Sequence, residues 1–399
     1  MTDTPLPPRR VPFPETASRP VAAGIEPSVV WRVADADALD AQYEGRAPGY
    51  AYAREGHPNA TRLAAQIDAL EGAPEAFPGG GLMFGSGMGA VSAVLFGLLA
   101  PGDHVVAAAQ LYGRTLRLMT DDLPRWGVRV DFVDPTDGAA IAAAMRPETR
   151  MVWVETVSNP TLRVADMVAA RAAARESGAR LVVDNTFTTP RGFRAFGFGA
   201  DVVVHSVTKM LAGHSDATLG WAAARDPGDR ERLLAAQASF GATASPFDCW
   251  LAERGLATFA LRYDAAEANA THLAAHLAGL PGVDSVIHPG RADHPDHARA
   301  VDLLGGRWGT MVSFRLRGGR EAVNRLLRAA PELPFAPSLG DVQTLLSHPP
   351  SSSHRGLTAE GRAALGITEG FLRVSVGVEE VGTLTAAVSA AVAAATEGA

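Results

Sequence analysis

The chain has 399 residues, of which 47% are hydrophobic and 20% are charged, an ordinary composition for a globular protein that is too long for one small core. Its net charge of −7 and the lack of a basic run argue against a nucleic-acid partner, and its apolar stretches are too short to span a bilayer. The single cysteine, Cys249, excludes an intramolecular disulfide framework and is expected to lie buried in a helix. A cytoplasmic protein with no membrane partner is therefore expected.

The N-terminal part of the chain differs from the rest in composition. The first twenty residues are rich in proline and lack an apolar core of signal-peptide length, so we expect an extended arm there. We divide the chain into this arm with the segment that follows it (1–60), a large domain (61–250) and a smaller C-terminal domain (251–399).

Short β-branched runs alternate with alanine-rich helical stretches between about residues 80 and 220. The runs are apolar on both faces, as buried strands are, and stand at 103–110, 128–135, 150–160, 180–187 and 201–209. The helical stretches between them are 90–100, 115–126, 138–145 and 166–178. This alternation predicts an α/β fold with a mainly parallel sheet between layers of helices.

The pattern of apolar residues changes after about residue 250. Residues 245–280 have the pattern of long helices. Further strands are expected at 283–289, 309–319 and 371–379, with a helix at 322–330 and an alanine-rich helix at the C-terminal end. We therefore predict a smaller α+β domain in this part of the chain.

Polar residues gather at or just after the ends of the predicted parallel strands. Ligands bind at the carboxyl ends of the strands in sheets of this kind, so a site is expected there. The residues are Glu155, Asn159, Asp184, Ser206, Thr208 and Lys209.

Lys209 is the only lysine among 36 lysines and arginines. A lysine amine can lose its proton and attack a carbonyl to form a Schiff base, whereas an arginine stays protonated and cannot. If the amine served only as a surface charge, arginine would do as well. The sequence therefore predicts a chemical role for Lys209, although an aldolase or a decarboxylase could also use such a lysine.

Other residues in the sequence narrow the range of reactions in which Lys209 could form a Schiff base. Asp184 could hold a pyridinium nitrogen protonated, although a helix cap or an ion pair would also explain it. A glycine-rich turn from residue 85 enters an apolar helix and could bind a phosphate. Tyr112 could stack on a flat ring or simply pack in the core, and Arg373 could clamp a substrate carboxylate. These features point to pyridoxal 5′-phosphate (PLP) only as a set.

The segment SVTKMLAGHSD (206–216) resembles the long Schiff-base signature of the Cys/Met-metabolism family of PLP-dependent enzymes. The resemblance runs from about residue 45 to 395 and implies a fold-type I PLP-dependent transferase. It implies that Lys209 carries the cofactor and later moves protons, that Asp184 pairs with the pyridine nitrogen, and that Tyr112 stacks on the ring. No metal site is implied.

The resemblance assigns further residues to the cofactor and the substrate. Gly87 and Met88 would offer backbone N–H groups to the phosphate, beside the hydroxyls of Ser206 and Thr208. Asn159 would contact the ring hydroxyl of the cofactor and the substrate. Tyr52 and Arg54 would reach the phosphate of a neighbouring subunit, and Tyr52 or Tyr112 could act as acid or base. Ser338 and Arg373 would bind the substrate carboxylate. The active site would then be shared within a homo-oligomer, usually a tetramer in this family.

The expected reaction is γ-elimination or γ-replacement on a small amino-acid substrate of the cystathionine or homoserine-ester type. Gln237 and Ala238 stand where methionine γ-lyases show a Lys-Asp pair, which counts against that activity. Leu339 follows Ser338 where typical bacterial cystathionine β-lyases have tryptophan. A C–S β-lyase and a specialised biosynthetic γ-replacement enzyme remain as alternatives, and a scaffold protein without turnover as a third.

Arg114 could lie near the distal end of the substrate and favour an anionic side group, or it could point to solvent.

Overall fold

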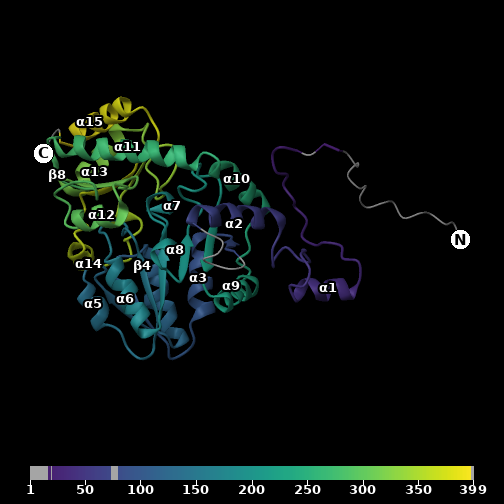
Figure 1. Cartoon of the computed structure of the whole chain (residues 1–399). Helices are drawn as coiled ribbons and strands as arrows, with labels where there is room; N and C mark the ends of the chain where they lie inside the picture. Colours follow the sequence, from purple (N-terminus) through teal and green to yellow (C-terminus); the bar gives the residue numbers. More distant parts are fainter. Residues whose placement is uncertain (1–16, 19, 73–79, 397–399) are drawn as a thin grey trace.

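The structure, a computed structural model, describes residues 17–18, 20–72 and 80–396 (Figure 1). The arm expected over the first twenty residues lies almost wholly outside these described residues. Within the described part of the chain, every helix is too short or too polar to cross a membrane.

A seven-stranded sheet forms the centre of the large domain, in the order β1-β7-β6-β5-β4-β2-β3. Neighbouring strands from β6 to β3 run parallel, whereas β7 runs antiparallel to both β6 and β1. The strands are β1 (Leu82–Phe84), β2 (His104–Ala108), β3 (Arg129–Val133), β4 (Thr149–Glu155), β5 (Arg180–Asp184), β6 (Val202–His205) and β7 (Gly220–Ala224). The expected α/β class and mainly parallel sheet are confirmed.

Successive residues of the central strands face two separate cores, which explains why the strands are apolar throughout. In β4, Met151 and Trp153 pack with α3 (Gly87–Leu98) and α9 (Pro227–Phe240) on one face of the sheet. Val152 and Val154 pack with α2 (Pro58–Glu71) and α6 (Met167–Ser177) on the other face. A strand buried on both faces needs apolar side chains at every position.

A second, antiparallel sheet lies in the C-terminal part of the chain, in the order β10-β11-β9-β8. Its strands are β8 (Val283–Ile287), β9 (Met311–Leu316), β10 (Leu345–Ser347) and β11 (Phe371–Ser375). A third core joins this sheet to α11 (Phe259–Ala278), α13 (Gly319–Ala329) and α15 (Val381–Thr396). The expected smaller C-terminal α+β unit is confirmed in its elements, but the boundary drawn at 250/251 falls inside α10 (Pro246–Leu256), so the domain limits stay a prediction.

The remaining elements connect these layers. The helix expected at 115–126 is a succession of three helical types rather than one helix, because Pro124 lacks the N–H that an α-helix would need there. These are α4 (Gly113–Arg117), the π-helix η2 (Leu118–Asp122) and the 3-10 helix η3 (Leu123–Trp126). The others are α5 (Gly138–Ala143), α7 (Thr189–Gly192), α8 (Ala195–Phe198), α12 (His297–Leu304), η4 (Pro349–Ser351) and α14 (Ala359–Ala364). Cys249 is fully buried in α10, as expected.

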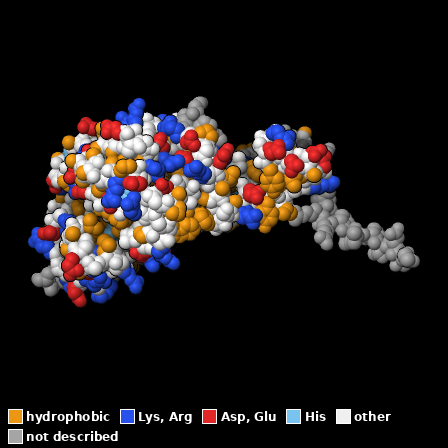
Figure 2. All heavy atoms as spheres, turned by 90° about the horizontal axis from the view of Figure 1, so that it is seen from below, with side chains coloured by type: hydrophobic (Ala, Val, Ile, Leu, Met, Phe, Trp, Pro, Cys, Tyr) orange, Lys and Arg blue, Asp and Glu red, His pale blue; other side chains and the backbone are white. Residues whose placement is uncertain are grey.

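The N-terminal helix α1 (Ala36–Tyr43) stands away from the body of the molecule (Figure 1). None of its residues is buried, and the segment around it exposes the apolar side chains of Val21, Val29, Val30 and Tyr43. Figure 2 shows apolar side chains on this projecting part of the chain. An exposed apolar arm of this kind is typical of a segment that packs against another chain.

Gly340, in the C-terminal part of the chain, lies tightly against the backbone of Lys209 and Met210. Its φ of +81° lies in the left-handed region, and a Cβ atom there would lie 2.3 Å from the backbone nitrogen of Met210. Both the conformation and the space therefore require glycine at this position.

We expect Gly340→Ala to destabilise the protein by roughly 3 kcal/mol, because left-handed strain and a backbone clash add together. Gly305→Ala is the matched control, since Gly305 has a φ of +59° with no atom within 4 Å of a Cβ. That control should lose only about 1 kcal/mol, the cost of strain alone. Denaturant unfolding measures both, and equal losses would contradict the close approach.

Candidate active site

A cavity of about 1150 Å³ opens at the carboxyl ends of β4, β5 and β6. The topology places it there, because parallel neighbours end at the same edge of the sheet. All of the expected site residues except two line this cavity, namely Gly87, Met88, Tyr112, Arg114, Asn159, Asp184, Ser206, Thr208, Lys209, Ser338 and Arg373.

Tyr52 and Arg54 are the two expected residues that do not line the cavity. The Arg54 guanidinium lies over the Tyr52 ring, 5.0 Å from its centroid, and the Thr243 hydroxyl donates to the Arg54 carbonyl at 3.0 Å. Tyr52 is 39% exposed. Their expected contact with the phosphate of a neighbouring subunit stays a prediction, since it requires a second chain.

The Lys209 side chain points into the cavity from a tight turn after β6. Its Nζ donates to the Ser338 Oγ at 3.2 Å, and its backbone N–H donates to the Ser206 carbonyl. The buried Arg262 supports the turn, because its guanidinium donates to the carbonyls of Met210 and Leu211. Burial lowers the pKa of the Lys209 amine to about 8, and the Arg373 cation contributes to the same shift. A minor but appreciable fraction of this amine is therefore uncharged at neutral pH, rising to half near pH 8.

Arg373 enters the same cavity from β11 of the small sheet and is 4% exposed. Its Nη1 donates to the Asn159 Oδ1 at 2.7 Å and its Nη2 to the Ser338 carbonyl at 2.9 Å, while its Nε has no partner among the described residues. Burial lowers the pKa of Arg373 to about 10, so the group is still charged at neutral pH. None of the described carboxylates pairs with it, and a buried cation of this kind fits an anionic ligand.

Glu155 and Asp184 end the neighbouring strands β4 and β5 and lie opposite each other in register. Burial, with the Asp184 charge second, raises the pKa of Glu155 well above its usual range. Burial also raises the pKa of Asp184, while hydrogen bonds from Thr186 oppose that shift. Two carboxyl groups so close cannot both ionise easily, so the pair tends to hold a proton between them. An anionic Asp184 would fit a cation such as a pyridinium, and its expected pairing with the pyridine nitrogen stays a prediction.

The N-terminus of α3 presents free backbone donors to the cavity. The side chain of Ser86 caps the helix by accepting from the Gly89 N–H, which leaves the amides of Gly87 and Met88 without an intrahelical acceptor. A Cβ on Gly87 would lie 2.7 Å from the Ser206 Cβ, so only glycine fits at this point. Amide donors at a helix start beside a serine hydroxyl fit the phosphate of PLP.

Thr208 lies where the sequence places it, but its hydroxyl already has two partners. The Oγ1 donates to the Leu219 carbonyl at 3.1 Å and accepts from the Leu219 N–H at 2.8 Å. This side chain ties the turn that carries Lys209 to the start of β7. Its expected bond to the phosphate stays a prediction.

Tyr112 and Arg114 lie at the exposed side of the cavity. Tyr112 is 41% exposed, and its backbone N–H donates to the Glu155 Oε1 at 2.5 Å. Arg114 is exposed and forms no ion pair with any described carboxylate. The turn between them lies against the loop that carries Ser353, because a Cβ on Gly113 would meet the Ser353 carbonyl at 2.0 Å.

The sequence reasoning missed two groups of this cavity. Glu155 stood out as a polar strand end but received no role, since its pKa depends on contacts that a sequence does not show. His354, 3% exposed, also lines the cavity, and burial lowers its pKa to about 4. Nothing local in the sequence around His354 indicates that it lies beside residues more than 140 positions away.

Comparison with known proteins assigns the chain to a family. The family model described as Cys/Met metabolism PLP-dependent enzyme matches residues 14–393. The chain is 41% identical over 335 residues to cystathionine β-lyase of Bacillus subtilis (strain 168), with 84% of each protein covered. It is 38% identical over 336 residues to cystathionine γ-lyase of the same organism, with 84% of this chain and 86% of that protein covered.

A solved structure agrees with this assignment. The structure of cystathionine γ-synthase from Xanthomonas oryzae pv. oryzae in complex with cystathionine matches with a TM-score of 0.88 and 36% identity, over 96% of each chain. The fold is therefore fold-type I, as expected, and the cofactor is PLP. The chain belongs to the Cys/Met-metabolism family of PLP-dependent enzymes and is a lyase or transferase of sulfur amino-acid metabolism.

Proposed function

We propose that the chain catalyses PLP-dependent γ-elimination or γ-replacement on a γ-substituted amino acid of the cystathionine or homoserine-ester type. The observation that carries this proposal is the link through Ser338, whose hydroxyl accepts from Lys209 and whose carbonyl accepts from Arg373. An α-carboxylate bound at Arg373 would set the α-carbon of the same amino acid beside the Lys209 amine.

Each residue of the site would then have one task. Bound PLP would supply the ring that accepts electrons from the α-carbon of the substrate. Lys209 would hold the cofactor until the substrate amine displaces it, and its uncharged amine would then take the proton from the α-carbon. γ-Chemistry also needs a proton removed from the β-carbon, which suits a base on a long, flexible side chain. Asp184 would keep the ring nitrogen protonated.

The remaining cavity residues would hold the cofactor in place. The amides of Gly87 and Met88 and the hydroxyl of Ser206 would bind its phosphate, supported by the free donors at the start of α3. Tyr112 would stack on the ring from the open side of the cavity, and Asn159 would contact the ring hydroxyl.

We propose further that the protein is a homo-oligomer whose active sites are shared between chains. The exposed apolar arm around α1 supports this assembly (Figure 2), as does the place of Tyr52 and Arg54 outside the cavity of their own chain. A tetramer is the assembly that the family resemblance implies.

A C–S β-lyase acting on cystathionine is the second candidate. It is favoured by the 41% identity to a cystathionine β-lyase. Leu339, which lines the cavity and is 7% exposed, stands where typical bacterial cystathionine β-lyases have tryptophan, and this supports the γ-reaction instead.

Arg114 would select for an anionic group at the far end of the substrate. It lines the cavity, carries a charge that none of the described carboxylates pairs with, and lies two residues from Tyr112. A succinyl ester or the distal carboxylate of cystathionine would supply the matching charge.

The pH dependence of covalent cofactor attachment tests the role of Lys209. We expect the rate at which cofactor-free protein forms a borohydride-reducible bond with PLP to reach half its maximum near pH 8 and to level off above it. Only the uncharged amine attacks a carbonyl, and burial lowers the pKa of Lys209 to about 8 from its usual 10.5. Because the chain has no other lysine, peptide mass spectrometry identifies the labelled residue without ambiguity.

Two variants control that measurement. Lys209→Arg should give no label on residue 209, because a guanidinium does not form an imine. Arg373→Gln should move the half-maximal pH upward, since the Arg373 cation helps to lower the pKa of Lys209. A wild-type rate that keeps rising up to pH 10 would show that the amine is not the buried group described above.

The products formed from L-cystathionine test the reaction. We expect 2-oxobutyrate, ammonia and cysteine, because γ-cleavage breaks the bond between sulfur and the four-carbon part of cystathionine. Pyruvate with homocysteine would support the β-lyase instead. If neither oxo acid forms, incubation with a homoserine ester and a thiol tests γ-replacement. Absence of that reaction as well would contradict the proposed function.

The preference for charged substrates tests Arg114. In Arg114→Ala we expect kcat/KM for O-succinylhomoserine, relative to that for O-acetylhomoserine, to fall by about fivefold, the size expected when one exposed charge pair is lost. Arg125→Ala is the control, because Arg125 is an exposed arginine nearby that pairs with Asp122 and does not line the cavity. An unchanged ratio in Arg114→Ala would show that this arginine faces solvent.

A further inference from the structure

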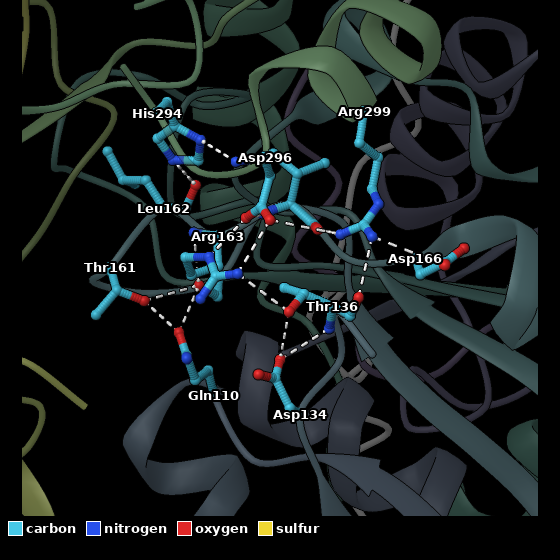
Figure 3. A network of polar contacts seen from close by, with 12 residues as sticks. Gln110, Asp134, Thr136, Thr161, Leu162, Arg163, Asp166, His294, Asp296 and Arg299 are labelled. Carbon is cyan, nitrogen blue, oxygen red and sulfur yellow. Dashed lines mark hydrogen bonds and ion pairs between the residues drawn. The ribbon is translucent and has the colours of Figure 1, made fainter. Parts of the chain in front are cut away.

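A loop of the large domain, residues 158–165, is held by a segment of the C-terminal part of the chain, residues 294–299 (Figure 3). The Arg163 guanidinium donates from Nε to the Asp296 Oδ2 at 2.6 Å and from Nη2 to the Asp296 Oδ1 at 3.0 Å. The backbone N–H of Val164 donates to the same carboxylate at 3.0 Å. Asp296 is 8% exposed, so water screens these contacts little.

Arg299 adds a second set of contacts from the same C-terminal segment. Its guanidinium donates to the Val164 carbonyl at 2.9 Å and to the Thr136 carbonyl at 3.0 Å. The end of the loop is therefore bound through both its N–H and its carbonyl groups, and Figure 3 shows these side chains converging on it.

The backbone of the loop is strained at Leu162, which has a φ of +55°. A buried leucine rarely adopts the left-handed region, so its surroundings must hold it there. The ring of His294 does so. Its Nδ1 accepts from the Asp296 N–H at 3.1 Å, which leaves Nε2 to carry the proton and donate to the Leu162 carbonyl at 3.0 Å. Burial lowers the pKa of His294, in keeping with a neutral ring.

The strained loop also carries Asn159, whose side chain orients Arg373. The Leu162 N–H donates to the Ser158 carbonyl at 3.0 Å, which closes the loop tightly around Asn159. The Asn159 Oδ1 accepts from the Arg373 Nη1 and is one of only two described acceptors for that guanidinium. A relaxed loop would therefore leave Arg373 held by the Ser338 carbonyl alone.

We propose that His294 and Asp296 are positioning residues that set the affinity of the site for the α-carboxylate of the substrate, by holding Asn159 and through it Arg373. This inference rests on the proposed binding of that carboxylate by Arg373. Neither residue lines the cavity, so they act only through the loop.

The test compares two ligands that differ by the carboxylate alone. L-Norleucine and pentylamine both present an amine and an alkyl chain, and each is titrated into the PLP-loaded enzyme while the visible absorption of the cofactor is followed. In His294→Leu and Asp296→Asn we expect the Kd for norleucine to rise about tenfold, the size of a coupling carried through one packed contact. The Kd for pentylamine should stay within about twofold.

Two further variants separate positioning from general loss of stability. His294→Gln keeps an N–H donor and should recover most of the norleucine affinity. Asp229→Asn is the matched control: Asp229 is 5% exposed and accepts from the Nε and Nη2 of Arg180 as Asp296 does from Arg163, but it does not touch the loop. It should leave both affinities unchanged.

Several results would overturn the inference. These are an unchanged norleucine affinity in His294→Leu and Asp296→Asn, an equal weakening of both ligands, or the same weakening in Asp229→Asn. If the wild-type enzyme binds norleucine no better than pentylamine, the proposed carboxylate site at Arg373 fails, and this inference fails with it. The first three results leave that site intact, so the two failures are distinguishable.

Discussion

Two cationic groups, the Lys209 amine and the Arg373 guanidinium, enter one buried space and share Ser338 as a partner. Burial disfavours the charge on both groups and lowers the pKa of each, and the Arg373 cation lowers the pKa of Lys209 further. Lys209 therefore loses its proton at a lower pH than an exposed lysine does, whereas the arginine stays protonated at physiological pH. The result is an amine that loses its proton readily beside a fixed cation, a pair suited to binding the carboxylate of an amino acid while taking a proton from its α-carbon.

That arrangement depends on how the two sheets are placed relative to each other. Lys209 follows β6 of the large sheet, whereas Arg373 lies on β11 of the small sheet and Ser338 precedes β10. Gly340 allows the C-terminal part of the chain to approach the lysine backbone, and the contacts of Asp296 with the loop at 158–165 join the same two parts at a second place. The chemistry of the site is therefore a property of the contact between the two parts of the chain.

The same geometry explains why relatives of this chain carry out different reactions. The groups from the start of α3 to Arg373 fit a PLP phosphate and an α-carboxylate, which are common to all of these reactions. A β-lyase, a γ-lyase and a γ-synthase can each use them, and proteins of all three names are similar to this chain. The residues proposed to distinguish the reactions, Arg114 and Leu339, also line the cavity.

The sequence by itself determined the class of the fold and the edge of the sheet where the cavity opens, and it singled out Lys209 as the candidate reactive amine. It could do so because burial on both faces imposes an apolar pattern on each strand, and because one lysine among arginines marks a chemical need. The short strands β1 and β10 and the alanine-rich β7 were not predicted, since three residues or a run of small side chains carry no clear period. Only the tertiary structure decided that burial raises the pKa of Glu155, that the Thr208 hydroxyl bonds the backbone of Leu219, and that Asn159 orients Arg373. These properties follow from desolvation and from distances between residues far apart in the chain, and no local pattern records them.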